Sequence, residues 1–258
     1  MNPLQRSLIE KCGNDNGFEH VLTSDMDAVT LASARHLSRA TVNLESGAYQ
    51  IRFQASSPSL LAELSRSFSQ TGKSSSEFAA LNEAALAALL RRAAELSRAL
   101  PNQAVTDYQQ VVAAELADLP TGIIGTEVER LVRQRVGQNK FREAMLVYWG
   151  GACAVTGIAV PEVLRASHAI PWAECTSDAE RLDVFNGFLL NANLDALFDR
   201  FLISFDEEGY LIVAPALTNV DLKLLGIGAK MKLRWVSPLH QPYLAMHRCR
   251  LMQLSVPE

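Results

Sequence analysis

The sequence predicts an α+β protein that folds as two domains. Strand-like runs followed by helical patterns fill the first half, and these runs lie at about 27–31, 40–43 and 49–53. A second series, in the order strand, turn, strand and helix, follows residue 160. Between the two series, the residues 119–125 contain Pro120, Gly122 and Gly125 and are typical of a linker. We therefore expect one domain at 1–122 and a second domain at 123–258.

Helical spacing recurs through the first half. A short helix is expected at 3–12, and a second begins near Pro58, which suits the first turn of a helix. A long Ala- and Leu-rich segment predicts a helix from about 76 to 100, with a further helix at 106–116. Apolar stripes of this kind are typical of a buried core.

Composition favours a globular protein of the cytoplasm. The chain has 258 residues, of which 48% are hydrophobic and 20% are charged. No window approaches eighteen uninterrupted apolar residues, and the first twenty residues lack the apolar core of a signal peptide. We expect no membrane partner. The four cysteines are far apart, which excludes a C-x-x-C zinc knuckle and a disulfide framework.

The overall charge of −4 does not indicate a non-specific nucleic-acid binder. A local basic segment could still contact DNA, because no acidic residue interrupts the stretch 130–142. Its expected DNA-binding residues are Arg130, Arg133, Arg135, Gln138, Lys140 and Arg142. From charge alone, a solvated helix face explains the same pattern more simply.

The second half brings together a histidine, an asparagine and an acidic pair on successive predicted elements. His168 lies near the end of an apolar strand, and Asn186 begins a turn before the next strand. On the helix that follows, Asp195 and Asp199 stand four residues apart and share one face. Two carboxylates so placed suit Mg²⁺ or Mn²⁺, although a helix cap or a pair with Arg200 would also explain them.

Three spaced motifs in this half resemble the HNH (ββα-metal) endonuclease family. They are Cys-x-x-Thr-Gly at 153–157, Ser-His-x-x-Pro-Trp at 167–172, and Asn-Gly…Phe-Asp from Asn186 to Asp199. Weaker similarity at 136–148, 205–209 and 243–248 extends the resemblance to about half of the chain. It implies a nuclease domain of two strands and a helix, preceded by a helical segment.

The resemblance also implies a role for each motif residue. His168 would be the general base that takes a proton from the attacking water, and Asn186 would hold the loop that orients it. Asp195 stands where the family most often has a last histidine that binds metal, and Asp199 matches an acidic position one turn later. Ser167 occupies a position where many relatives carry a metal ligand, so the metal sites expected here are Asp195, Asp199 and Ser167.

The first half is the natural candidate for choosing the target, because a ββα module contacts mostly the DNA backbone. Arg35, His36 and Arg39 follow a predicted strand and could grip a phosphate, although an ordinary polar turn is at least as simple an explanation. The segments 16–19 and 32–36 faintly resemble sulfur-binding domains of modification-dependent restriction enzymes. A methylcytosine reader or a plain duplex-binding domain fits nearly as well.

We therefore predict a metal-dependent DNA endonuclease of the modification-dependent, type IV-like restriction class, which acts in phage defence on modified double-stranded DNA. Restriction nucleases of this kind commonly pair two active sites to cut both strands, which predicts a homodimer. Two alternatives remain open at this stage. One is a DNA-binding protein with a catalytically degenerate HNH module, and the other is a nuclease that acts on RNA or nicks structured DNA.

Overall fold

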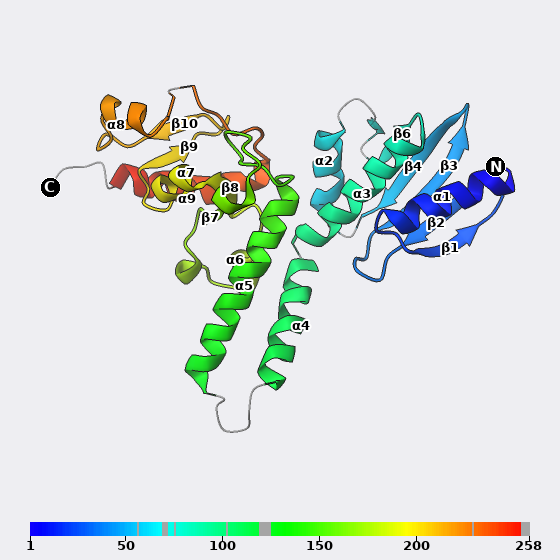
Figure 1. The fold of residues 1–258 in the computed structure, drawn as a ribbon, viewed down its shortest axis with the longest axis horizontal. Helices are drawn as coiled ribbons and strands as arrows, with labels where there is room; N and C mark the ends of the chain where they lie inside the picture. The colour runs from blue at the N-terminus through cyan, green and yellow to red at the C-terminus, as the bar shows by residue number, and fades with distance from the viewer. Residues whose placement is uncertain are drawn as a thin grey trace. The chain divides into compact units, whose positions relative to one another are not determined.

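The computed structural model describes residues 1–55, 57–68, 72–74, 76–101, 103–118, 125–228 and 230–253; for 72–74 it describes the backbone alone. The chain is of the α+β class, as predicted, and divides into two compact units, Met1–Gln103 and Ala104–Glu258 (Figure 1). The linker expected at 119–125 lies almost entirely outside the described residues. The helix expected at 106–116 falls in the second unit, because it packs there on the helix that follows it.

The first unit is built on one antiparallel sheet of six strands in the order β1-β2-β3-β4-β6-β5. The strands are β1 (His20–Ser24), β2 (Ala28–Ala32), β3 (Arg39–Glu45), β4 (Ala48–Gln54), β5 (Gly72–Ser74) and β6 (Glu77–Ala80). Alternation explains why one face is buried: Val29, Val42 and Ile51 point inward while Thr30, Thr41 and Arg52 point outward. The three strand predictions at 27–53 are confirmed as β2, β3 and β4.

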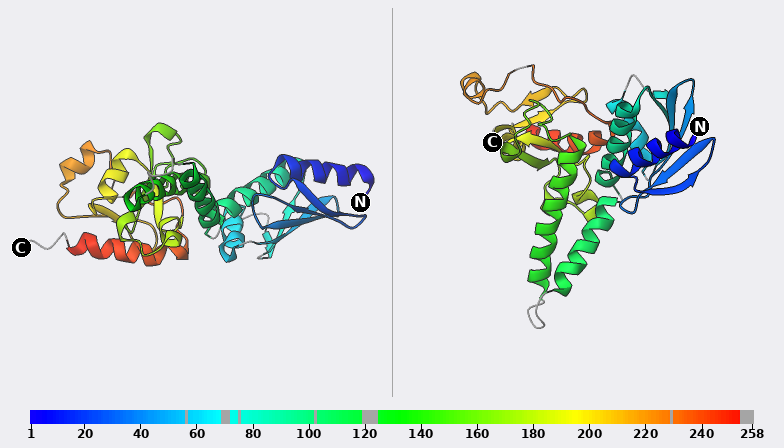
Figure 2. Two further views of the ribbon diagram at one scale, coloured as in Figure 1. Left: turned by 90° about the horizontal axis from the view of Figure 1, so that it is seen from below. Right: turned by 45° about the vertical axis from the view of Figure 1, so that its right-hand side comes forward.

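Three helices accompany the sheet: α1 (Pro3–Asp15), α2 (Pro58–Ser67) and α3 (Glu83–Ala99). In two views α1 and α3 lie side by side on the same face of the sheet (Figure 2). Ile9, Leu86 and Leu90 are fully buried beneath them. The core of this unit therefore lies between the apolar face of the sheet and these two helices.

The long helix predicted at 76–100 begins later than expected, and its first residues form strand β6. Phe78 and Ala80 alternate inward and pair with β4, so sheet pairing prevails over the helical spacing of the segment. Leu81, which lies within the predicted helix, is 81% exposed. The helix starts after Asn82, whose side-chain oxygen accepts a hydrogen bond from the Ala85 amide at 2.8 Å.

The second unit opens with two long helices, α4 (Gln103–Ala117) and α5 (Thr126–Tyr148), which run side by side (Figures 1 and 2). The Tyr108 hydroxyl joins them by donating to the Arg133 carbonyl at 3.3 Å. The remaining strands are β7 (Leu164–His168), β8 (Gly187–Asn191), β9 (Ile203–Phe205) and β10 (Leu211–Val213). The remaining helices are α6 (Asp178–Arg181), α7 (Ala192–Phe198), α8 (Asn219–Leu224) and α9 (Gln241–Gln253), with short 3₁₀ turns η1 (Pro161–Val163), η2 (Trp172–Glu174) and η3 (Pro238–His240).

An aromatic core fixes the β7–β8 hairpin in this unit. Phe188 on β8 stacks on the His240 ring with centroids 5.1 Å apart and meets Trp149 at 6.0 Å. On the other side, the His247 ring of α9 stacks on Phe198 of α7 at 3.8 Å. The hairpin and the helix after it are therefore held between α5 and α9. Across the described residues, none of the helices is long and apolar enough to cross a membrane.

Candidate active site

The centre of the second unit is a two-stranded hairpin followed directly by a short helix. Strands β7 and β8 pair antiparallel, with His168 opposite Gly187 and Leu164 opposite Asn191. A side chain at Gly187 is impossible here, because its Cβ would lie 2.1 Å from the Ser167 carbonyl oxygen. Asn191 then caps α7 by accepting a hydrogen bond from the Leu194 amide at 3.0 Å. The predicted order of strand, turn, strand and helix is confirmed.

His168 ends β7 with its ring held in one tautomer. Its Nε2 lies 2.9 Å from the Arg181 carbonyl oxygen, which can only accept, so Nε2 carries the proton. The lone pair is left on Nδ1, the atom that can receive a proton. Burial lowers the pKa of the ring to about 4. His168 is therefore neutral at physiological pH.

Two aromatic side chains fix the plane of the His168 ring. Phe141 of α5 stacks on it, with centroids 3.7 Å apart and planes inclined by 20°. Trp172 meets it edge to face at 5.8 Å. Trp172 can approach because α5 has a glycine beneath it: a Cβ on Gly137 would lie 2.1 Å from the indole. The orientation of the His168 ring is therefore fixed by side chains that lie about thirty residues before it and four residues after it in the sequence.

Asn186 ties the loop after His168 to the start of β8. It is fully buried, its Oδ1 accepts from the Ile170 amide at 2.8 Å, and its carbonyl accepts from the Ala169 amide at 3.0 Å. Its Nδ2 donates to the Glu180 carbonyl at 3.1 Å, next to the Arg181 carbonyl that holds His168. These contacts agree with the loop-holding role expected for Asn186.

The two aspartates lie one turn apart on α7, with Asp195 inside the helix and Asp199 at its C-terminal cap. Asp195 accepts a hydrogen bond of 2.6 Å from the Ser167 hydroxyl, and Ser167 is almost completely buried. Burial first, and then the charge of Asp195, raise the pKa of the Asp199 carboxyl to about 6. Ser167 thus orients an acidic group in this structure, while its part as a metal ligand stays a prediction.

His168 and both aspartates line the same open cavity, whose volume is about 490 Å³. Its other lining residues are Gln138, Asn139, Phe141, Arg142, Arg165, Ala166, Pro171, Trp172 and Phe201. Within the described part of the chain, no group of three or more His, Cys, Asp or Glu residues is arranged to hold a metal ion. Asp195 and Asp199 are therefore the acidic pair that this cavity offers to a cation.

Comparison with known families agrees with this geometry. Residues 153–206 match the family model of HNH endonucleases. This segment is an HNH endonuclease domain. It contains all three sequence motifs and the β7–β8–α7 unit, so the family prediction is confirmed and the chain carries a nuclease domain in its C-terminal half. A comparison with curated proteins found no match for the chain.

The basic helix that leads into the HNH domain is less available to DNA than its sequence indicates. Arg130 pairs with Glu127, Arg133 with Glu129 and Lys140 with Glu143, at 2.7 to 2.9 Å, and Arg135 pairs with Glu115 of α4. Glu127, Glu129 and Glu143 lie just outside the stretch 130–142, and Glu115 lies on the preceding helix, so the composition of the stretch alone does not reveal these partners. These exposed pairs can exchange for phosphate at small cost, so their contact with DNA stays a prediction.

Gln138 and Arg142 lie closer to the chemistry, since both line the cavity of the HNH domain. The Arg142 guanidinium also donates to the carbonyls of Leu164 at 2.6 Å and Pro161 at 3.0 Å. These bonds anchor the start of β7 to α5. Arg142 therefore has a structural task at the site besides any contact with substrate.

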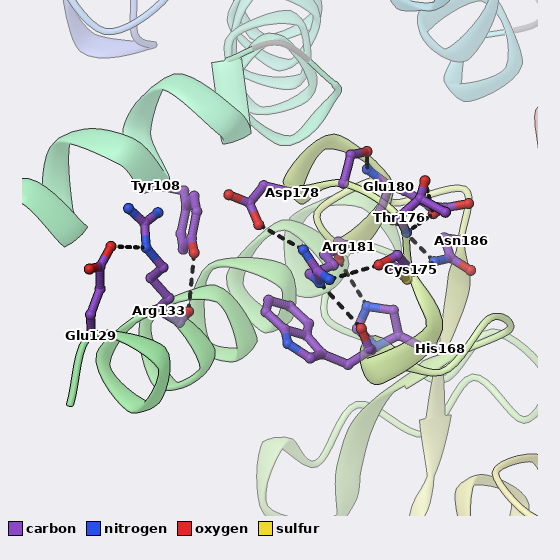
Figure 3. A network of polar contacts seen from close by, with 12 residues as sticks. Tyr108, Glu129, Arg133, His168, Cys175, Thr176, Asp178, Glu180, Arg181 and Asn186 are labelled. Atoms are coloured by element: carbon purple, nitrogen blue, oxygen red, sulfur yellow. Dashed lines mark hydrogen bonds and ion pairs between the residues drawn. The ribbon is translucent and has the colours of Figure 1, made fainter. Parts of the chain in front are cut away.

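One residue of the site escaped the sequence analysis. Arg181 supplies the carbonyl that fixes His168, and its guanidinium donates to the carbonyls of Cys175 at 2.7 Å and Trp172 at 3.2 Å, and to Asp178 at 3.0 Å (Figure 3). It thereby closes the loop between the strands of the HNH hairpin. No residue spacing signals this role, because the key group is a main-chain carbonyl.

The residues expected at a DNA contact in the first unit separate from one another. Arg35 is exposed, whereas the His36 ring is buried with its Nε2 donating to the Gly17 carbonyl at 3.1 Å. Arg39 begins β3 and points to the polar face of the sheet, since Ala40 after it points into the core. The structure therefore brings Arg35 and His36 together and leaves Arg39 on the other face.

Proposed function

We propose that the protein is a metal-dependent endonuclease that hydrolyses phosphodiester bonds of double-stranded DNA. The observation that carries this proposal is the state of His168 within an HNH domain. Its Nε2 is tied to the Arg181 carbonyl, its ring is neutral, and it lines one cavity with Asp195 and Asp199. A neutral imidazole of fixed tautomer next to two carboxylates is the arrangement that hydrolysis of a phosphate ester needs.

In the proposed reaction, His168 accepts a proton at Nδ1 from the water that attacks the phosphorus. The new bond between water oxygen and phosphorus forms as the bond to the leaving oxygen breaks. Phe141 and Trp172 keep the ring in place during this transfer, and the Arg181 carbonyl stabilises the imidazolium that results. The contacts of the His168 ring with Phe141, Trp172 and the Arg181 carbonyl support this proposal.

The acidic pair fits a hard divalent cation. Burial and the charge of Asp195 raise the pKa of Asp199, because both disfavour its ionised form. A nearby cation would stabilise that form. Mg²⁺ commonly binds through one or two carboxylates, with water and phosphate oxygens in its other positions. We therefore propose that Asp195 and Asp199 hold Mg²⁺ or Mn²⁺. When bound, it would stabilise the charge on the phosphoryl oxygens.

The decisive experiment is cleavage of a duplex DNA panel with Mg²⁺ and with Mn²⁺, comparing the natural chain with His168→Ala. The substitution should lower the cleavage rate by about 10²- to 10⁴-fold, the usual contribution of a general base. The matched control is His20→Ala, which removes an exposed histidine of β1 and should leave the rate unchanged. If no duplex is cut by folded natural protein that binds metal, the proposal is wrong.

A second candidate is a DNA-binding protein whose HNH module has lost catalysis. The observation that favours it is the small donor set, because Ser167 bonds to Asp195 and leaves two carboxylates at the cavity. Under this candidate, His168→Ala changes DNA binding no more than His20→Ala does, and neither protein cuts. The same pair of variants therefore separates the two functions.

For biological class we propose a modification-dependent restriction endonuclease of the cytoplasm, acting in phage defence. The support is the separate first unit, which leaves the HNH domain free to contact the backbone while another surface selects the target. The panel should accordingly contain unmodified, cytosine-methylated, hydroxymethylated and phosphorothioated duplexes. Cleavage limited to one modified duplex supports this class, while equal cleavage of all of them contradicts it. A homodimer with paired active sites stays a prediction.

A further inference from the structure

The first unit contains a second hollow, of about 420 Å³, next to α3. Arg91 and Arg98 of α3 line it, seven residues apart and therefore on one helix face. Arg35 joins them from the loop between β2 and β3. The turn after α1 reaches this face because Gly17 lies there: with φ +89°, its Cβ would be 2.7 Å from the Ala94 Cβ.

The three arginines are not neutralised by acidic side chains. Among the described residues, Arg35 and Arg98 make no ion pair, and Arg91 donates from Nε to the amide oxygen of Asn16 at 3.1 Å. The remaining N–H groups of these guanidinium groups are available to a ligand. Asn16 is itself almost completely buried and holds its place by donating to the Cys12 carbonyl at 2.7 Å.

The acidic side chains of the hollow already have partners. Asp15 pairs with Lys11 at 2.6 Å, and Glu95 lies 3.5 Å from Arg92. Glu19 accepts from the Ser33 hydroxyl at 2.9 Å and the Ala34 amide at 3.2 Å. The lining holds three arginines and three acids, and Lys11 and Arg92 beside it pair with two of those acids, so the three arginines are left against one acid without a cationic partner. Burial keeps the pKa of His36 below its usual range, which favours the neutral ring.

The opposite face of the same sheet has the reverse charge balance. A hollow of about 320 Å³ there is lined by Asp27, Glu45 and Glu77, with Arg52 as its one cationic lining residue among those described. Arg52 is already paired with Glu77 at 2.5 Å. That face repels a phosphate, so within the first unit an anion is directed to the arginines of α3 and the β2–β3 loop.

We propose that the hollow formed by Arg35, Arg91 and Arg98 binds a phosphate of the duplex DNA backbone, as a contact separate from the HNH cavity. This inference rests on the proposed function for the identity of its ligand. Guanidinium groups bind phosphate oxygens through paired hydrogen bonds, and three around one hollow suit a single phosphate group. The contact carries affinity and register but does not read the base sequence.

The test is binding of the full chain to a labelled duplex in EDTA, followed by fluorescence anisotropy over a range of salt concentrations. The duplex is the one in the panel that the natural chain binds most tightly. Arg35→Gln and Arg98→Gln should each weaken binding about tenfold. Each should also lower the slope of log affinity against log salt by about one, which is the signature of one lost phosphate contact.

Arg52→Gln is the matched control, because it removes the same charge from an exposed arginine on the opposite face of the sheet. Its affinity should stay close to that of the natural chain. The inference is overturned if Arg35→Gln and Arg98→Gln bind like the natural chain, as they would if the hollow held a free phosphorylated metabolite. It is also overturned if Arg52→Gln is equally weakened, or if the natural chain binds no duplex.

Cleavage of the same duplex with Mg²⁺ separates this inference from the proposed function. If the natural chain binds through Arg35 and Arg98 but cuts nothing, the nuclease proposal fails and the phosphate site stands. If it cuts, while both variants bind normally, the nuclease proposal stands and the phosphate site fails. Thermal melting of each variant shows whether the fold is retained, and since all three arginines are exposed, we expect unchanged midpoints.

Discussion

At the scale of single residues, the HNH site depends on groups that hold the reactive ones. His168 and Asp195 face the cavity, whereas the Arg181 carbonyl and the Ser167 hydroxyl fix their orientation from behind. Both contacts cross the hairpin from segments distant in sequence: 13 residues separate His168 from Arg181, and 28 separate Ser167 from Asp195. Removing the Ser167 contact should change how well the site binds the proposed metal rather than abolish the chemistry.

Ser167→Ala tests this expectation. Loss of the 2.6 Å hydrogen bond leaves Asp195 free to rotate, so the concentration of Mg²⁺ needed for half-maximal cleavage should rise by about 10- to 100-fold. Cleavage at saturating Mg²⁺ should remain within about tenfold of the natural rate. A metal titration of the cleavage rate measures both quantities. An unchanged titration would mean that Ser167 has no part in placing Asp195.

At the scale of elements, α5 is shaped by the loop that packs on it. Gly137 lies in the middle of this 23-residue helix, where alanine would normally be favoured by about 1 kcal/mol. The indole of Trp172 occupies the space that a Cβ would need. The glycine therefore gives up helix stability so that the loop after His168 can approach α5.

Gly137→Ala should lower the melting temperature by several degrees in spite of the higher helix propensity of alanine, because the new methyl group displaces Trp172. Cleavage should fall as well, since Trp172 contacts the His168 ring. Gly125→Ala, at the N-cap of the same helix, is the control: among the described residues nothing lies within 4 Å of its Cβ, so its cost is that of alanine at a cap, about 1 kcal/mol, and the melting temperature should fall less. Equal melting of the two variants would contradict this account of α5.

At the scale of the whole molecule, two buried histidines couple stability to pH. Burial lowers the pKa of His168 and of His247 to about 4. In the unfolded chain both rings have a pKa of about 6.5. Between this pH and about 4, each ring binds a proton in the unfolded chain but not in the folded chain. Their contribution to stability is therefore complete above pH 6.5 and is lost as the pH falls from about 6.5 to about 4.

The free energy of unfolding should accordingly fall by a few kcal/mol over this acid range, at about 1.4 kcal/mol per pH unit for each fully shifted histidine. The measurement is urea unfolding of the natural chain and of His247→Asn at several pH values between about 7 and about 4. It separates the pH dependence of stability due to His247 from that due to the carboxylates. The variant should be less stable at pH 7 but lose less stability on acidification. Parallel pH curves for the two proteins would contradict it.

Local pattern was enough for much of the fold. Short strand-like runs predicted β2, β3 and β4, local sequence predicted helices at α1 and α4, and the turn at Asn186-Gly187 predicted the HNH hairpin. Local pattern failed at 76–82, where the segment has helical spacing but β4 offers an unpaired strand edge. Hydrogen bonding to a neighbouring strand is a property of the assembled sheet, so propensity within the segment could not reveal it.

For the candidate active site, the sequence by itself singled out the groups to which we assign roles, because His168, Asn186 and the acidic pair stand at recognisable positions of a motif. Only the tertiary structure decided their state. The tautomer of His168 depends on a main-chain carbonyl and its pKa on burial, while the basic stretch of α5 is paired with acids that lie outside it. Charge, proton position and solvent access depend on distances between atoms that are remote in sequence, and only folding sets those distances.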